Sequence, residues 1–85
     1  PKTKLLHITH IVNWVGQILP VQAICKMAKA KGVEVIVDGA HSFGLLDFKV
    51  SELGCDYFGT SLHKFLSAPI GSGMLWIKKE KIAKI

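Results

Sequence analysis

The stretch Val33-Glu34-Val35-Ile36-Val37 is β-branched and almost continuously apolar. A strand with one wet face alternates apolar and polar residues, whereas a strand covered on both faces reads as an apolar run. The five residues therefore predict a strand inside a parallel sheet. They lead directly into Asp38-Gly39-Ala40-His41, which places an acid and a histidine at the end of that strand.

The residues before this strand have the pattern of an amphipathic helix that begins near residue 20. One apolar face recurs at i, i+3, i+4 and i+7 and consists of Val21, Ile24, Cys25 and Ala28. Pro20 suits the first position of such a helix, and Gly32 suits its carboxyl-terminal cap. An apolar run at residues 5–12, followed by a turn at residues 13–17, predicts an earlier strand. Strand, helix and strand predict a parallel crossover unit, which is right-handed by default.

The rest of the chain predicts two further strands. Residues 55–59 and residues 73–77 are apolar runs, and a helical turn at residues 49–53 precedes the first of them. The short connection between the runs makes residues 73–77 the candidate for an antiparallel strand, and residues 78–85 resemble the start of a helix. We therefore expect an α/β fold with a mostly parallel sheet. One full helix cannot cover both faces of such a sheet, so the missing helices must come from elsewhere.

Length and composition indicate a piece of a larger protein. A chain of 85 residues buries only about 60–65% of its unfolded surface. Its hydrophobic fraction of 49% and mean hydropathy of +0.36 exceed what a small self-contained domain needs, and it begins at Pro1 with no initiator methionine. Cys25 and Cys55 lie in apolar contexts without metal-ligand spacing, which is typical of reduced core cysteines in a cytoplasmic protein.

The charge pattern argues against a nucleic-acid or membrane partner. The net charge of +5 arises with eleven lysines and no arginine, and seven of the lysines lie at residues 26–31 and 78–84. Proteins that read bases and phosphates rely on the bidentate contacts of arginine, so these lysines indicate solvated helix faces. No apolar run approaches the roughly 18 residues that a membrane-spanning helix needs, and no signal peptide is visible.

A candidate site follows residues 55–59, at Thr60-Ser61-Leu62-His63-Lys64. Ligands of open α/β sheets bind at the carboxyl ends of the strands, and a lysine there can serve as a nucleophilic amine. Asp38 and His41 are predicted at the same edge, so a cation, an anion and a proton carrier share one rim. Taken singly, Lys64 could be a solvated lysine, Asp38 a structural acid and His41 an ordinary turn histidine.

Other chemistries fit the sequence less well. We expect no metal, because the histidines and cysteines that could bind one lack metal-ligand spacing; they are His7, His10, His41, His63, Cys25 and Cys55. The stretch Gly71-Ser72-Gly73 precedes a strand and lacks the third glycine of a dinucleotide-binding loop. Ser61 lacks the flanking glycines of a hydrolase nucleophile. Trp14 and Trp76 are most simply core or subunit-contact aromatics.

Three groups of residues, taken together, resemble one family. Asn13, Gly16 and Pro20, then Asp38-Gly39-Ala40-His41, then Ser61-Leu62-His63-Lys64 are similar to the central portion of the class V aminotransferases. These are pyridoxal-phosphate enzymes of fold type I, and they include cysteine desulfurases and isopenicillin-N-epimerase-like proteins. The resemblance runs from about residue 9 to residue 79. Histidine at position 41, where desulfurases usually have glutamine, is closer to the epimerase-like branch.

The resemblance implies that residues 1–85 are part of the large domain of a pyridoxal 5'-phosphate enzyme acting on an amino acid. Lys64 would form the Schiff base with the cofactor aldehyde and then move the substrate α-proton. Asp38 would pair with the pyridine nitrogen and keep it protonated. His41 would also tune the proton affinity of the Schiff base. Asn13 and His41 would lie beside the ring and its phenolic oxygen. Ser61 and His63 would contact the phosphate.

The resemblance also implies parts that these residues do not contain. The amino-terminal phosphate-binding turn, the ring-stacking residue and the carboxylate-binding arginine have no counterpart here, so the isolated chain is expected to be inactive. In the family the site lies near a dimer interface, which implies a homodimer of the full-length protein. Two alternatives stay open. One is a cysteine desulfurase or selenocysteine lyase, whose mobile catalytic cysteine neither Cys25 nor Cys55 supplies, and the other is a non-catalytic α/β module that kept the fold and lost the site.

Overall fold

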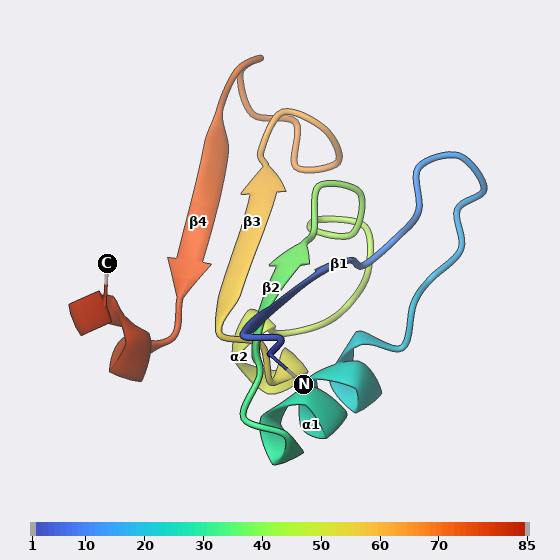
Figure 1. Cartoon of the computed structure of the whole chain (residues 1–85). Helices are drawn as coiled ribbons and strands as arrows, with labels where there is room; N and C mark the ends of the chain where they lie inside the picture. The colour runs from blue at the N-terminus through green and yellow to red at the C-terminus, as the bar shows by residue number, and fades with distance from the viewer. Residues whose placement is uncertain (1, 85) are drawn as a thin grey trace.

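The computed structural model describes residues 2–84, which form a four-stranded sheet with three helical segments (Figure 1). The strands, in their order across the sheet, are β1 (Leu5–Thr9), β2 (Glu34–Asp38), β3 (Tyr57–Ser61) and β4 (Gly73–Ile77). The helical segments are α1 (Val21–Ala30), α2 (Val50–Leu53) and the 3-10 helix η1 (Lys79–Lys84). β1, β2 and β3 are parallel and β4 is antiparallel to β3, so the predicted α/β fold with a mostly parallel sheet is confirmed.

α1 connects β1 to β2 and ends at the predicted glycine cap. The Val33 amide donates to the Ala28 carbonyl at 2.9 Å, and the Gly32 amide donates to the Lys29 carbonyl at 3.1 Å. Gly32 has a φ of +70°, which costs a residue without Cβ little. Pro20 was predicted as the first helical residue, and this was wrong by one position. Its ψ of 69° is not helical, and it stands just before the helix.

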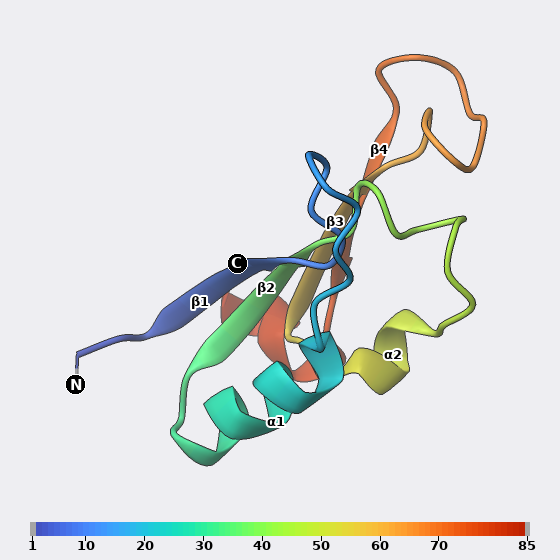
Figure 2. The same cartoon turned by 90° about the vertical axis from the view of Figure 1, so that its right-hand side faces the viewer.

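The core lies between the sheet and the two α-helices, which share one side of the sheet (Figure 2). Val35 and Val37 of β2 and Phe58 of β3 are at most 1% exposed. The burial of each such side chain contributes about 1.5–3 kcal/mol. They pack against Leu53 of α2 and against the predicted apolar face of α1, whose buried members are Val21, Cys25 and Ala28.

The opposite face of the sheet is only partly covered. Side chains alternate along a strand, so Glu34, Ile36 and Asp38 point away from the buried valines of β2. On this second face, Leu5 of β1 and Leu75 of β4 are 53% and 55% exposed. The helices of this chain therefore leave one face incomplete, as the sequence predicts.

β1 is shorter than predicted, and β2 is shifted by one residue from its predicted position. β1 ends at Thr9 instead of residue 12, because the chain turns away there and Ile11 pairs with Ile18 in an isolated antiparallel bridge. β2 was predicted at residues 33–37, but it begins at Glu34 and includes Asp38, which pairs with Thr9. Asp38 is thus the last residue of a strand and not the first residue of a loop.

β3 starts two residues later than predicted and includes Thr60 and Ser61. The reason is its partner: Tyr57 pairs with Ile77 and Ser61 pairs with Gly73, so β4 extends β3 toward its carboxyl end. β4 has the predicted bounds and the predicted antiparallel direction. The helical turn predicted at residues 49–53 is present as α2.

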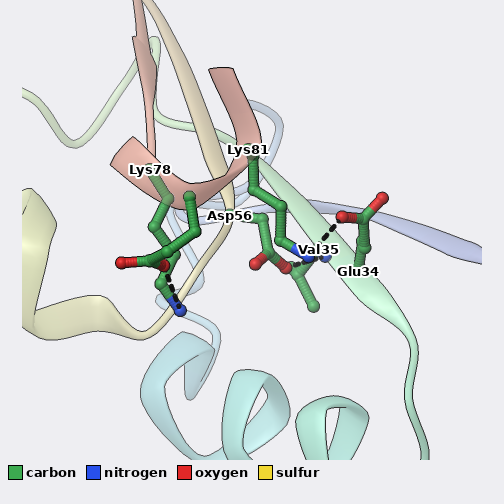
Figure 3. A network of polar contacts seen from close by, with 6 residues as sticks. Glu34, Val35, Asp56, Lys78 and Lys81 are labelled. Carbon is green, nitrogen blue, oxygen red and sulfur yellow. Dashed lines mark hydrogen bonds and ion pairs between the residues drawn. The ribbon is translucent and has the colours of Figure 1, made fainter. Parts of the chain in front are cut away.

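Asp56 joins the beginnings of β2 and β3 to the end of β4 (Figure 3). Its carboxylate accepts the Val35 amide at 2.9 Å and its own amide donates to the Val35 carbonyl at 2.9 Å. Its carbonyl accepts the Lys78 amide, also at 2.9 Å. A residue between regular elements therefore supplies three of the hydrogen bonds at this end of the sheet.

The chain after β4 is a 3-10 helix and not the α-helix that residues 78–85 predicted. The Lys81 amide donates to the Lys78 carbonyl at 2.8 Å, an i to i+3 bond, and Ile85 lies outside the described residues. Lys81 pairs with Glu34 at 2.6 Å and Lys78 with Glu80 at 3.6 Å (Figure 3). These two lysines are therefore half-buried ion-pair members, whereas the lysines of α1 are exposed as predicted.

The predictions for cysteine and tryptophan are largely correct. Cys25 and Cys55 are free and buried in the core. Burial raises the pKa of both thiols, that of Cys55 to about 11. Trp76 packs against the core, as predicted. Trp14 is 88% exposed, because the turn after β1 carries it away from the sheet. The prediction that Trp14 is a core residue is therefore wrong for this core. No helix within residues 2–84 is both long and apolar enough to cross a membrane.

Candidate functional site

Three parallel strands end at one edge of the sheet, the upper edge in Figure 1. Thr9 at the end of β1 pairs with Asp38 at the end of β2, and Asp38 pairs with Gly59 of β3. The residues that the sequence nominated for the site lie either at the last position of a strand or in the segment that follows it. Ligand sites of open parallel sheets lie at this edge.

Asp38 is held by hydrogen bonds on both its main chain and its side chain. Its carboxylate accepts the Ala40 amide at 3.0 Å, which closes a tight turn after β2. Its carbonyl accepts the His10 amide at 2.9 Å, which joins the end of β1 to the same turn. The carboxylate lies on the less covered face of the sheet, opposite the buried Val37.

Lys64 and His41 meet across 23 residues of sequence. Lys64 Nζ lies 3.4 Å from His41 Nε2, at the long end of hydrogen-bond distances. Which of the two atoms donates depends on the tautomer of the imidazole, because a ring nitrogen accepts a hydrogen bond only where it carries no hydrogen. The imidazole also packs edge-on against Phe65, with the ring centroids 6.3 Å apart. The structure thus joins the predicted amine and the predicted proton carrier.

Ser61 and His63 lie between β3 and the loop that leads to β4. Ser61 ends β3 and is half-buried. His63 Nδ1 lies 3.4 Å from the Ser72 carbonyl, so this imidazole is turned toward the returning loop. Asn13 is exposed on the turn after β1, and none of the contacts within residues 2–84 joins its side chain to Asp38, His41 or Lys64.

Thr60 and Gly39 shape the site, and sequence reasoning assigned them no role. The Thr60 hydroxyl donates to the Gly39 carbonyl at 3.1 Å, and the Gly39 amide donates to the Gly59 carbonyl at 2.8 Å. The Phe58 ring fills the place where a Cβ at position 39 would stand. Only glycine fits there, and the close approach of a fully buried ring fixes the turn that carries Asp38 and His41. A glycine directly after a strand acid was the signal in the sequence.

An apolar hollow of the structure lies away from this edge. A hollow of about 360 Å³ lies between α1 and the beginnings of β1 and β2, and its lining includes Leu6, Met27 and Val33. Within residues 2–84, no three histidine, cysteine or acidic side chains gather as a metal site would require. Three candidate side chains, Asp38, His41 and Lys64, thus lie at this edge, and among the described contacts His41 and Lys64 touch each other while the Asp38 carboxylate bonds the Ala40 amide.

Three comparisons relate the chain to known proteins. The family model described as aminotransferase class V matches residues 1–85. The chain is 39% identical over 85 residues to isopenicillin N epimerase from Streptomyces clavuligerus, and 42% identical over 84 residues to a probable cysteine desulfurase from Halalkalibacterium halodurans. A solved cysteine desulfurase from Thermococcus onnurineus has the same fold over 94% of this chain, with a TM-score of 0.89 and 35% identity.

The matches cover nearly all of this chain but only part of each relative. They span 100% and 99% of this chain against 21% and 20% of the epimerase and the desulfurase, and 20% of the solved structure. The chain therefore spans about a fifth of the length of these relatives. Because the family model matches from the first residue to the last, this chain belongs to the aminotransferase class V family.

Proposed function

We propose that residues 1–85 are part of the large, cofactor-binding domain of a pyridoxal-phosphate enzyme that acts on an amino acid or a related amine. The observation that carries the proposal is the approach of Lys64 Nζ to His41 Nε2 at 3.4 Å, at the edge where Asp38 ends β2. An amine, an imidazole and a carboxylate on one open edge are the groups that such an enzyme requires.

The residues at this edge fit pyridoxal phosphate. Lys64 is exposed, so its amine is accessible to an aldehyde. Asp38 uses one carboxylate oxygen for the Ala40 amide, and within residues 2–84 the other oxygen has no hydrogen bond and can accept one from a protonated pyridine nitrogen. When bound, the cofactor supplies an electron sink for the charge that develops on the substrate α-carbon.

Each of the three central side chains has a distinct task in this proposal. Lys64 Nζ would hold the cofactor covalently and would act as the base that takes up the substrate α-proton. Asp38 keeps the pyridine nitrogen charged, because a neighbouring anion favours the protonated form. His41, already within reach of Nζ, orients that amine and adjusts its affinity for a proton.

Three further polar residues complete the cofactor side of the proposal. Asn13 lies on the turn that leaves β1 and is assigned to the phenolic oxygen of the ring. Ser61, at the end of β3, and His63, in the following loop, are assigned to the phosphate as hydrogen-bond donors. We also propose that the complete protein is a homodimer, in which groups missing from residues 1–85 come from the rest of the polypeptide and from a partner subunit.

A cysteine desulfurase or selenocysteine lyase is the second candidate, and the relatives named as cysteine desulfurases favour it. That reaction needs an accessible cysteine that attacks the substrate's sulfur or selenium. Cys25 and Cys55 are 1% and 2% exposed, so neither can serve. In this candidate the nucleophilic cysteine lies outside residues 1–85.

The test is covalent retention of pyridoxal phosphate by the complete polypeptide that contains these residues. The parent should show a visible absorption band that borohydride converts into a permanent covalent label on Lys64, which peptide mapping by mass spectrometry locates. Lys64→Ala should lose the label completely. Lys26→Ala, which changes an exposed lysine of α1, is the matched control and should behave as the parent. A parent that takes up no label, or a label that survives in Lys64→Ala, would refute the proposal.

A second variant separates attachment from chemistry. Asp38→Ala should still take up the borohydride-fixed label, because the amine of Lys64 is intact. Turnover should fall on the order of 10²–10³-fold, since the preorganised charge beside the ring nitrogen is gone. Equal turnover in Asp38→Ala and the parent would show that Asp38 is a structural residue. That result would favour the alternative in which this chain belongs to a non-catalytic α/β module.

A further inference from the structure

His10 is a buried titratable residue directly behind the proposed site, and the proposed function gives it no task. It lies one residue beyond β1 and is 6% exposed. Among the described residues, its Nδ1 is a buried side-chain nitrogen with no hydrogen-bond partner. His7, three residues earlier on β1, is exposed. His7 on β1 and His10 just after it are thus in opposite environments, one exposed and one buried.

His10 is connected to the turn of Asp38 by two independent routes. Along the main chain, its amide donates to the Asp38 carbonyl at 2.9 Å. Through side chains, its ring packs edge-on against Phe48 at 5.1 Å between centroids, and Phe48 packs against Phe58 at 5.9 Å. The Phe58 ring in turn occupies the space beside Gly39. The imidazole therefore supports, from inside the fold, the same turn that presents Asp38 and His41 at the edge.

We propose that His10 is a positioning residue of this site, and that it holds the Asp38–His41 turn only while its imidazole is uncharged. The inference rests on the proposed function, because the turn matters through the residues that it presents to the cofactor. A proton on the ring would create a charged donor at Nδ1 with no acceptor, in a buried position against the ring of Phe48. Hydration stabilises the charged ring, so the ring moves toward water. That movement removes the side chain against which Phe48, and through it Phe58, is packed.

Among residues 2–84, no charged side chain forms a hydrogen bond or an ion pair with the His10 ring that would compensate the proton. Four titratable side chains lie on the segments that pack around it: Asp38, His41, Asp47 and Lys49. None of them has a hydrogen bond or ion pair with the imidazole among the described contacts. Asp38 bonds the turn amide of Ala40, and Asp47 and Lys49 are exposed.

The direction of the acid effect follows from the linkage between protonation and folding. Burial lowers the pKa of His10 below its usual 6.5, so the packed state releases a proton that the opened state binds. Above about pH 6.5 both states are neutral and the stability of the turn does not change. As the pH falls below about 6.5, the population of the opened state relative to the packed state rises by up to tenfold for each pH unit. The rise ends where the packed imidazole is itself protonated.

The experiment measures hydrogen–deuterium exchange of residues 38–43 in the complete polypeptide, with and without pyridoxal phosphate, between pH 8 and pH 5. Rates are corrected for the intrinsic pH dependence of exchange. In the parent, protection of these amides should fall by up to about tenfold per pH unit below about pH 6.5. In His10→Phe, which keeps an aromatic ring and cannot take up the proton, protection should stay level. His7→Phe is the matched control and should follow the parent.

A second variant guards against a folding defect in the first. His10→Gln keeps a polar side chain of similar reach and also cannot be charged, so it too should give a level profile. If amide protection still falls below pH 6.5 in either folded variant, the inference is overturned. It is also overturned if protection does not fall in the parent. Because the measurement on the cofactor-free protein needs no bound cofactor, its result is independent of the covalent label on Lys64. Retention of that label below pH 6.5 should be higher in His10→Phe than in the parent.

Discussion

Gly39 shows how one residue without a side chain can set the geometry of the whole edge. An alanine at position 39 would place its Cβ less than 3.0 Å from Cζ of Phe58, a ring that is fully buried and cannot move away without opening the core. We expect Gly39→Ala to destabilise the protein by about 1–3 kcal/mol, the usual cost of overpacking. The measurement is the midpoint of urea unfolding, followed by the fluorescence of the complete polypeptide.

The adjacent strand offers a matched control for this prediction. A Cβ at Gly59 meets no atom within 4 Å, and Gly59 has no positive φ, so Gly59→Ala should shift the midpoint little. The double variant Gly39→Ala with Phe58→Leu should recover part of the loss, since a smaller side chain frees the space. If both single glycine variants unfold at the same midpoint, the close approach of Phe58 is not what requires glycine at position 39.

At the scale of elements, one side chain aligns the beginnings of the strands. The Asp56 carboxylate accepts the Val35 amide, and Asp56→Ala would leave that amide without its partner next to a buried strand. The cost of an unsatisfied group of this kind is about 1–3 kcal/mol. Asp56→Asn keeps an acceptor oxygen and should lose clearly less. Urea unfolding midpoints of the three proteins test this, and equal losses in both variants would mean that the carboxylate charge, and not the hydrogen bond, is what matters.

At the scale of the whole molecule, the two thiols report whether the core is closed. Cys25 and Cys55 face the same core from α1 and from the segment before β3. Burial raises the pKa of Cys55 from 9.0 to about 11, and two pKa units lower its thiolate fraction about 100-fold at pH 8. Since the thiolate is the reactive form, both residues should alkylate far more slowly than glutathione at that pH.

Iodoacetamide labelling with peptide mapping measures this prediction. In denaturing urea, both cysteines should react at the ordinary rate of an exposed thiol, which serves as the control. Because the two thiols belong to one core cluster, their native labelling rates should rise together as urea is added. Rapid labelling of Cys55 in native buffer would contradict a closed core, and labelling of one thiol long before the other would show that this core opens in parts.

Much of the fold could be predicted from the sequence because its signals are local. The apolar run of β2, the helical spacing of α1 and the glycine that ends it act within a few residues of one another. β4 was predicted with its bounds and direction from an apolar run and a short connection. Strand ends were predicted less well, because pairing with a neighbour decides them. β3 is displaced by two residues so that Tyr57–Ser61 can pair with all of β4.

The sequence by itself determined the α/β class, the core face of α1 and the presence of an acid, an imidazole and an amine at the strand ends. The contact between Lys64 and His41 joins residues 23 positions apart, and its 3.4 Å separation depends on how two loops fold back over the edge. The burial of His10 beside the exposed His7 was equally invisible, because both are histidines in one apolar run. Only the tertiary structure decided these features, since side-chain environment depends on which distant residues pack against a position, and local spacing carries no record of that.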